Sequence, residues 1–339
     1  MGRKCITRKL SGPRFASVGV SYLLFCILLG FTSAARSQAS DYPARSVRLV
    51  VPFVSGGGND FVARVLADDL SKSLGQPFVV ENRPGGGGIT GTEAVVRSKP
   101  DGYTLLLSAT GSYTSGAYRE LPYDPLKDLT AIAHTTRIPL LLLVHPDSPA
   151  RTVQEFIQLA KERSGKLNFG TPGAGTVHHL ALELLKQQSG INVAHIPYKG
   201  SGQALTDFMA GRVDVMFMPE SPAGPHVRSG KLRVIGITIL ERSGDWPNVP
   251  TLHESGLTGF EAMAWQVIAA PAGTSAPIMR KLNDHINQAL TKPEVIKKLK
   301  GAGFDTVQST PEQAAAWVRK DSVKWIALIK SAGIEAPSE

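Results

Sequence analysis

The sequence predicts an α/β fold in which parallel strands alternate with helices. Short, β-branched and almost wholly apolar runs such as residues 47–52 are typical of strands buried on both faces. Segments with apolar residues at helical spacing, such as residues 60–70, follow them after short loops. The length of 339 residues suits two domains of roughly 100–200 residues each. We therefore expect two doubly wound domains.

The first strand and helix are joined by a loop rich in glycine, residues 53–59, which we call the first glycine loop. Three glycines allow a sharp turn and the close approach of a ligand, because they carry no Cβ. Asn59 is the expected N-cap of the helix. The first N–H groups of the helix and the positive end of its dipole then favour an anion in the loop. One such helix end contributes about 0.3–1 kcal/mol, so useful affinity for an anion needs a second.

The first domain continues with strands at residues 77–81 and 103–108 around a helix at residues 90–98. A rigid connection at residues 121–125 follows. The apolar run at residues 138–144 is then expected to cross into the second domain.

The glycines at residues 86, 88 and 91 match the pattern G-x-G-x-x-G. A dinucleotide site would also need an acidic residue about 20 positions further on, and would follow the first strand instead of the second. We interpret this loop as a turn or the rim of a pocket.

The second domain repeats the opening construction. A strand at residues 167–170 leads into residues 171–175, the second glycine loop, and Thr176 is the expected N-cap of a helix that runs to about residue 188. Two helix N-termini can then face each other across a cleft between the domains, where small ligands commonly bind. This arrangement favours a carboxylate or a similar anion.

The remaining segments complete both domains. Residues 263–270 are the expected strand that returns to the first domain, and three C-terminal helices are expected to pack on that domain. The remaining expected elements are strands at 193–197, 213–218 and 232–238 and helices at 152–163, 203–210, 276–290, 293–300 and 311–329.

Residues 1–35 have the pattern of a secretory signal peptide: basic residues, an apolar core at 18–31 and small residues at 32–35. Cleavage is expected after Ala35 or Ala39, so the protein is expected to be exported. A lipoprotein signal would need a small residue before Cys26, where Phe25 stands. A retained anchor would need about 20 apolar residues, more than this run provides.

Removal of this segment also removes both cysteines, so we expect no disulfide or thiol chemistry in the mature chain. Five of the basic residues behind the formal charge of +9 leave with it, and the mature chain is only mildly basic. This charge gives little support to nucleic-acid binding. The hydrophobic content of 42% against 19% charged residues excludes a disordered chain.

A series of motifs follows in a characteristic order and spacing: VPFVSGGGND (51–60), LGQPFVVENRPGGGG (74–88), GTPGAGTVHHLALELL (170–185) and HIPYKGSGQALTD (195–207). Over essentially the whole mature chain the sequence resembles the solute receptors of tripartite tricarboxylate transporters, the Bug family. The resemblance implies a two-domain, type II-like periplasmic binding protein with two crossover strands. The implied first domain comprises residues 41–142 and 264–339, and the second comprises residues 143–263.

The resemblance also implies that the carboxylate of the ligand is held between the two glycine loops, often through water. The residues carried over as ligand contacts are Ser55, Gly56, Gly57, Gly58, Asn59, Asp60, Gly173, Ala174, Gly175, Thr176, Val177, His178, Tyr198, Glu220 and Trp265. The chain departs from the family pattern at Val54, Ser55 and Asn59, where backbone donors still provide the anion contact. It also departs at residues 112–118, at residues 218–220 and at Gln266, and since these later departures fall where selectivity is set, the ligand should not be copied from a relative.

Several of these residues have two interpretations. Asp60 would repel an anion, so its first interpretation is a helix-start acid paired with Arg64; binding of water or an amine is the alternative. Thr176 is expected to be an N-cap. Its hydroxyl or N–H group either contacts the ligand as well or serves the helix alone. Glu220, if it faces the cleft, would favour a ligand with an amine, hydroxyl or ring nitrogen; otherwise it faces solvent.

Tyr198 and Lys199 follow a strand at the expected edge of the cleft, where Lys199 adds charge to the site or is simply solvated. Trp265 either packs over the ligand or lies in a hinge core. His178 and His179 are adjacent on a helix and so face different directions, whereas zinc ligands would stand at i and i+4.

The function expected from the resemblance is capture of a small carboxylated solute by clamshell closure and its delivery to a membrane transporter. Sensing by an orphan receptor is the alternative. An enzyme is a remote alternative, because G-x-S-x-G and phosphate-loop motifs are absent and only the glycines at 86–91 suggest a dinucleotide. We expect a monomer without catalytic residues, cofactor or metal.

Overall fold

The computed structural model of the protein describes residues 1–2 and 42–334. Residues 3–35 of the predicted signal segment, both cleavage positions and both cysteines lie outside the described residues. Residues 1–44 form a unit separate from residues 45–339, and the fold below is that of the second unit. Among the described helices, none combines the length and the apolar character that crossing a membrane requires.

A ten-stranded mixed sheet forms the centre of the fold, in the order β2-β1-β3-β9-β4-β7-β5-β6, with β8 and β10 also paired to β4. The strands are β1 (Val47–Val51), β2 (Phe78–Asn82), β3 (Thr104–Ala109), β4 (Leu129–Val144), β5 (Asn168–Thr171), β6 (Ala194–Pro197), β7 (Val215–Pro219), β8 (Arg233–Ile237), β9 (Met263–Pro271) and β10 (Asp305–Thr306). The parallel pairing of β1 with β2 and β3, and of β5 with β6 and β7, confirms the predicted winding.

Strand β4 joins two groups of strands, which we call the first and second sheet halves. From Leu129 to Pro139 it pairs antiparallel with β9, in the first sheet half with β1 to β3 and β10. From Leu140 to Val144 it pairs with β7 and β8, in the second sheet half with β5 and β6. β4 starts nine residues before the apolar run that predicted it. The proposed domain boundaries near residues 142 and 264 stay a prediction.

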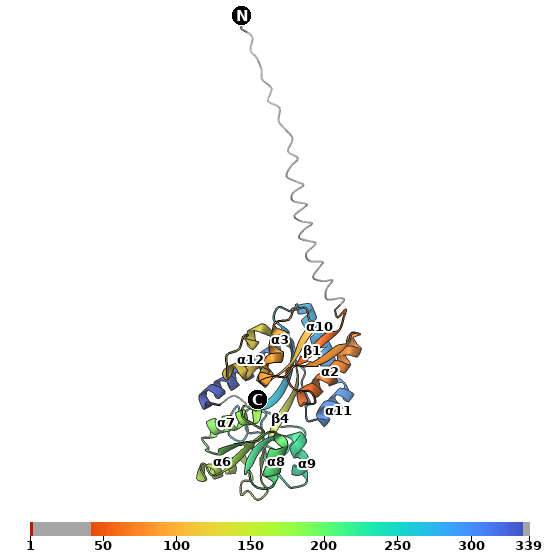
Figure 1. The fold of residues 1–339 in the computed structure, drawn as a ribbon. Helices are drawn as coiled ribbons and strands as arrows, with labels where there is room; N and C mark the ends of the chain where they lie inside the picture. Colours follow the sequence, from red (N-terminus) through yellow and green to blue (C-terminus); the bar gives the residue numbers. More distant parts are fainter. Residues whose placement is uncertain (3–41, 335–339) are drawn as a thin grey trace. The chain divides into compact units, whose positions relative to one another are not determined.

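The helices lie on both sides of the sheet, and in Figure 1 β4 runs between the helices of the first sheet half and α6 to α9 of the second. They are α2 (Gly58–Leu74), η1 (Gly86–Gly88), α3 (Ile89–Val96), α4 (Thr110–Thr114), η2 (Ser115–Ala117), α5 (Pro125–Asp128), α6 (Val153–Glu162), α7 (Val177–Ser189), α8 (Ser201–Met209), α9 (Glu220–Arg228), α10 (Ala276–Thr291), α11 (Pro293–Gly301) and α12 (Pro311–Ala332).

The sequence led us to expect that the C-terminal helix α12 packs on the first domain. In the structure it packs on both sheet halves. It contacts α4 and β4 but also α7 in the second sheet half. Trp325, Leu328 and Ile329 near its end belong to the same buried cluster as Leu180 and Leu184 of α7. A helix of 22 residues is about 33 Å long, so it extends beyond the elements that its first turns cover.

Candidate ligand-binding site

The first glycine loop leads from β1 into α2, which begins at Gly58. The N-cap is Gly57, with φ −80° and ψ 171°, and no side chain caps the helix. The expectation that Asn59 is the N-cap is therefore wrong. Asn59 lies inside the first turn, and its side-chain oxygen accepts a hydrogen bond from Gln266 Nε2 at 3.0 Å. An N-terminus without a side-chain cap leaves first-turn N–H groups available to an outside acceptor.

Asp60 is used inside the loop. Its side chain is buried, and its Oδ2 accepts hydrogen bonds from Gly56 N and from Arg64 Nε, both at 2.9 Å. The hydrogen bond from Arg64 is the main reason that the pKa of Asp60 lies below its ordinary value, against the opposing effect of burial. The predicted ion pair with Arg64 is confirmed. Gly56 has φ +81°, which suits glycine and allows the loop to turn back to Asp60.

Gly58 is held against an aromatic ring. A Cβ at this position would lie 2.9 Å from the Phe304 ring, which also stacks on Phe61 with ring centroids 6.4 Å apart. Glycine is therefore favoured here by packing. Gly57 differs, because a Cβ there would meet only Val54 O at an ordinary 3.6 Å.

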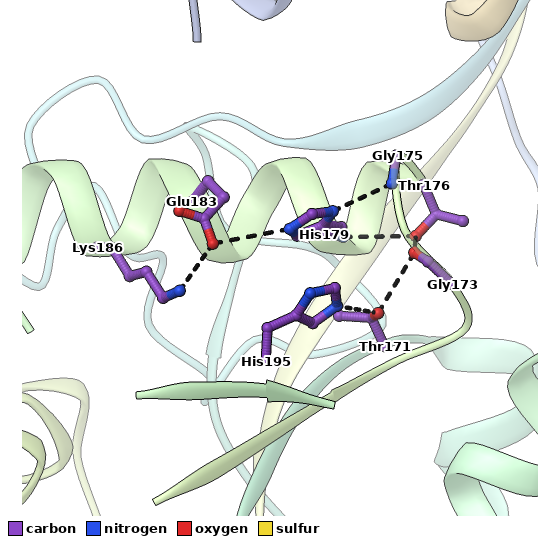
Figure 2. Close-up of polar contacts among 8 residues, drawn as sticks. All are labelled: Thr171, Gly173, Gly175, Thr176, His179, Glu183, Lys186 and His195. Carbon is purple, nitrogen blue, oxygen red and sulfur yellow. Dashed lines mark hydrogen bonds and ion pairs between the residues drawn. The ribbon is translucent and has the colours of Figure 1, made fainter. Parts of the chain in front are cut away.

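The second glycine loop leads from β5 into α7. Thr176 is the N-cap, as predicted: its Oγ1 accepts from His179 N and donates to Gly173 O at 2.8 Å. Gly175 has φ +70°, so the loop also needs glycine there. Figure 2 shows Gly173, Gly175 and Thr176 gathered around the start of the helix.

A polar network lies beneath this second loop, and the sequence did not reveal it. Gly175 N donates to His179 Nδ1 at 3.0 Å, and the His179 ring stacks on His195 of β6 with centroids 3.9 Å apart. His195 Nε2 lies 2.7 Å from Thr171 Oγ1, which donates to Gly173 O at 3.3 Å. Figure 2 shows the hydrogen bonds that reach the loop from His179 of α7 and from Thr171 of β5, with His195 beside Thr171. The second glycine loop is thus fixed by side chains from α7, β5 and β6.

One sequence signal pointed to His179. It stands three residues after the N-cap Thr176, the position from which a side chain reaches back to the start of a helix in a capping box. His195 and Thr171 had no such signal. On the far side of His179, Nε2 lies 3.7 Å from Glu183 Oε1, which in turn pairs with Lys186 at 2.8 Å.

The imidazole of His178 makes no hydrogen bond to the described part of the chain. Both ring nitrogens are buried, and neither has a hydrogen-bond partner among the described residues. Burial lowers the pKa of His178 to about 4. Burial is also the main reason that the pKa of His195 falls to about 4.

Tyr198 lies close to the second loop, with its carbonyl oxygen 3.4 Å from the position of a Cβ on Gly173. Its hydroxyl donates to Asp207 at 3.0 Å, away from the loop. Burial and the bond to Asp207 raise the pKa of Tyr198.

Glu220 begins α9, and its half-exposed carboxylate lies 3.5 Å from Arg228 Nη1. It also lines a small pocket with Lys300 and Asp305. Trp265 has no exposed surface, and its indole N–H donates to Asp321 Oδ2 at 2.6 Å. This is the core position that the sequence left as the alternative to a ligand contact.

In the described part of the chain no hydrogen bond or ion pair links the first glycine loop to the second. That the two loops face each other across a cleft therefore stays a prediction.

A pocket of about 580 Å³ is lined by the segment 239–245, by residues of α11, by Arg137 and by Phe304, the residue that packs on Gly58. Two of its cations are paired, Lys300 with Asp245 at 2.7 Å and Arg242 with Glu254 at 3.0 Å, whereas Arg137 Nε lies 3.9 Å from Asp305 Oδ2. Paired cations offer an anion less than uncapped helix N–H groups do. We therefore favour the glycine loops as the ligand site.

A family model, a sequence relative and solved structures all point to the same protein family. The family model described as the tripartite tricarboxylate transporter family receptor matches residues 62–334, which include the second glycine loop but not the first. The protein BugT of Bordetella pertussis is 38% identical over 305 residues, 88% of this chain and 93% of BugT.

Two solved structures are similar in fold. The periplasmic binding protein BugD has 34% sequence identity and a TM-score of 0.68, over 87% of this chain and 99% of BugD. MatC from Rhodopseudomonas palustris with bound malate has 34% identity and a TM-score of 0.67, over 85% of this chain and 100% of MatC. The resemblance seen in the sequence is confirmed. The chain belongs to the receptor family of the tripartite tricarboxylate transporters, a family of periplasmic solute-binding proteins with an α/β fold.

Proposed function

We propose that this receptor captures a small carboxylated solute between its two glycine loops as the sheet halves close, and delivers it to a tripartite tricarboxylate-type membrane transporter. The observation that carries the proposal is the start of α2, where Gly57 is the N-cap and no side chain forms a capping hydrogen bond. A carboxylate oxygen is a suitable acceptor for such N–H groups.

The helix ends alone do not give sufficient affinity. Micromolar binding needs about 8 kcal/mol, and two partly buried helix ends supply about 4 kcal/mol at most. Burial of the rest of the ligand and a few further hydrogen bonds supply the difference. MatC binds malate, so dicarboxylates are the first candidates for this chain.

The proposal includes the predicted domains, 41–142 with 264–339 and 143–263, and the predicted contact residues of both loops. It also includes export and cleavage of the signal segment, action as a monomer, and the absence of catalysis, since family and fold are those of receptors. Use of the same site in sensing, without a transporter, is the second candidate.

The first test is native mass spectrometry of the protein purified from the periplasm without unfolding. A carboxylated metabolite bound one to one supports the proposal, and a bound nucleotide contradicts it. An empty protein is then titrated calorimetrically with acetate, malate, adipate and citrate.

Two variants test the loops themselves. Gly57→Val adds a side chain where the backbone accepts one, and Ala174→Leu enlarges the second loop without changing a glycine at positive φ. Gly58 and Gly175 are poorer choices because packing or φ requires glycine there. The control is Gly244→Val, a glycine with open space around it. We expect at least tenfold weaker binding in the two loop variants and unchanged binding in the control; unchanged affinity in both loop variants contradicts the proposal.

A further inference from the structure

His178 lies in the first turn of α7, directly after the second glycine loop. The residue as a whole is half-buried, whereas both of its ring nitrogens are buried and unpaired within the described chain. A buried polar group without a partner is unfavourable, and native proteins contain few of them. We therefore expect the ring nitrogens to find a hydrogen-bond partner that is not part of the described chain.

His178 and His179 lie on different faces of α7, so His178 is not part of the polar network beneath the loop. Consecutive residues of an α-helix are about 100° apart, and His179 uses its ring on the side of β6. Val177, on the other side of His178, packs against a buried cluster that includes Trp325 and Leu328 of α12.

A second unpaired polar group packs against the same cluster from the first sheet half. Tyr118, which follows η2, contacts this cluster, and its hydroxyl is buried without a partner among the described residues. Helix α12 contacts both η2 and α7. Val177, the neighbour of His178, and Tyr118, which carries an unpaired hydroxyl from the first sheet half, thus pack against one cluster.

Other imidazoles of the chain are held by neighbours. Burial lowers the pKa of His134 and of His195 to about 4 as well. His134 stacks on Trp317 with centroids 5.3 Å apart, and His195 stacks on His179. Their rings are fixed by packing, whereas His178 makes no ring contact of this kind within the described residues.

The charges around α7 do not account for the lowered pKa of His178. The helix packs against β5, β7 and α12, and the two strands carry no charged residue. On α12, Asp321 accepts from two tryptophans and pairs with Lys324. On α7 itself, Glu183 pairs with Lys186. Burial is the cause of the low pKa, so the ring is neutral in the empty protein at neutral pH.

We propose that His178 hydrogen-bonds directly to the bound acid and that its ring takes up a proton when the acid binds. This inference rests on the proposed function and adds a proton to the binding reaction. An anion beside an imidazole stabilises the imidazolium, so the pKa of the ring is higher in the complex than in the empty protein. Between these two values the complex holds about one proton more, and affinity increases as the pH falls, by about tenfold per pH unit at most.

The experiment is titration calorimetry at pH 6 with acetate, malate, adipate and citrate, each in two buffers of different ionisation enthalpy. The difference in heat between the buffers gives the number of protons taken up. We expect uptake approaching one proton in the wild-type protein and close to none in His178→Asn.

The matched control is His285→Asn. His285 lies on α10, its Nδ1 is also buried without a partner in the described chain, and burial also lowers its pKa. We expect His285→Asn to take up protons as the wild-type protein does. Binding without proton uptake, or with equal uptake in His178→Asn, overturns this inference alone. Failure of the wild-type protein to bind any of the four acids overturns the proposed function and this inference together.

A second measurement needs no variant that must fold. Ring ¹⁵N shifts of histidine-labelled wild-type protein distinguish a neutral ring from an imidazolium. With saturating acid at pH 6, we expect one ring to change from neutral to charged. Rings that all keep their charge state on binding overturn the inference.

Discussion

Asn59 and Gln266 are 207 positions apart in the sequence, yet their side chains are joined by a hydrogen bond of 3.0 Å. Gln266 lies on β9 and also accepts from Thr136 Oγ1 of β4 at 2.6 Å. The first turn of α2 is thereby tied to β9 and, through it, to β4, the strand that joins the sheet halves. Replacing Gln266 releases Asn59 from β9.

We expect Gln266→Leu to weaken acid binding by about 2- to 12-fold, because one hydrogen bond contributes about 0.5–1.5 kcal/mol net. Titration calorimetry measures the change. Gln154→Leu is the control, since Gln154 Nε2 likewise donates one hydrogen bond, to Ser255 O, at a distance from both glycine loops. Equal losses in the two variants would show that Gln266 has no specific effect on the site.

His179 is predicted to position the second glycine loop through Gly175 N–H. Asn can place an acceptor near the position of Nδ1, whereas Leu cannot, so His179→Asn should keep most of the affinity and His179→Leu should lose about tenfold. His253 Nδ1 accepts from Gly259 N in the same way at 2.9 Å, in an exposed loop. His253→Leu therefore controls for loss of this type of bond and should bind as the wild-type protein does; similar affinities for His179→Leu and wild type would contradict the positioning role.

Asp321 is predicted to be important for stability. Its buried Oδ2 accepts from Trp265 Nε1 at 2.6 Å and Trp325 Nε1 at 2.8 Å, which connects β9 to α12. Asp321→Leu leaves two indole N–H groups unpaired, so we expect the free energy of unfolding to fall by about 2–5 kcal/mol. Asp321→Asn keeps an acceptor and should lose less.

Guanidinium unfolding measures both changes. Asp68→Asn, which removes an exposed ion pair with Lys72, should change stability by about 1 kcal/mol or less. A loss in Asp321→Leu no larger than in Asp68→Asn would refute the predicted role.

Stability is expected to fall with acid between about pH 6.5 and pH 4. Burial holds the pKa of His134 at about 4, below the value of about 6.5 for an unfolded histidine. In this interval the unfolded chain binds more protons than the folded one, so stability falls as the pH falls.

The check is the free energy of unfolding at pH 7 and pH 4.5. His134→Phe keeps an aromatic ring against Trp317 but cannot titrate, so its loss over this interval should be smaller than that of the wild-type protein. An identical loss would exclude His134 as a contributor.

The sequence alone predicted features that depend on short-range spacing. Thr176 as an N-cap and the pairing of Asp60 with Arg64 follow from positions three or four residues apart on one helix. The two strand–loop–helix units follow from local runs of apolar residues and from glycines. Each of these features is determined within about one turn of helix or one strand.

Contacts that depend on sheet pairing could not be predicted. Asn59 is a residue type that commonly caps helices. In the structure its side chain instead accepts a hydrogen bond from Gln266 of β9, a strand that comes much later in the chain. His195 lies under His179 only because β6 pairs with β5 in the register that sets it opposite Phe169. Single-sequence spacing contains no information about such registers.

Pro139 stands at the point where β4 leaves one set of partners for another. Proline has no N–H, so the ladder lacks a donor at this residue and the strand is held less firmly there than on either side. We expect relative rotation of the two sheet halves to be taken up as torsion around Pro139 instead of by a flexible linker. Because α12 also contacts both sheet halves, the angle between them would depend on this one position of β4 and on the packing of that helix together.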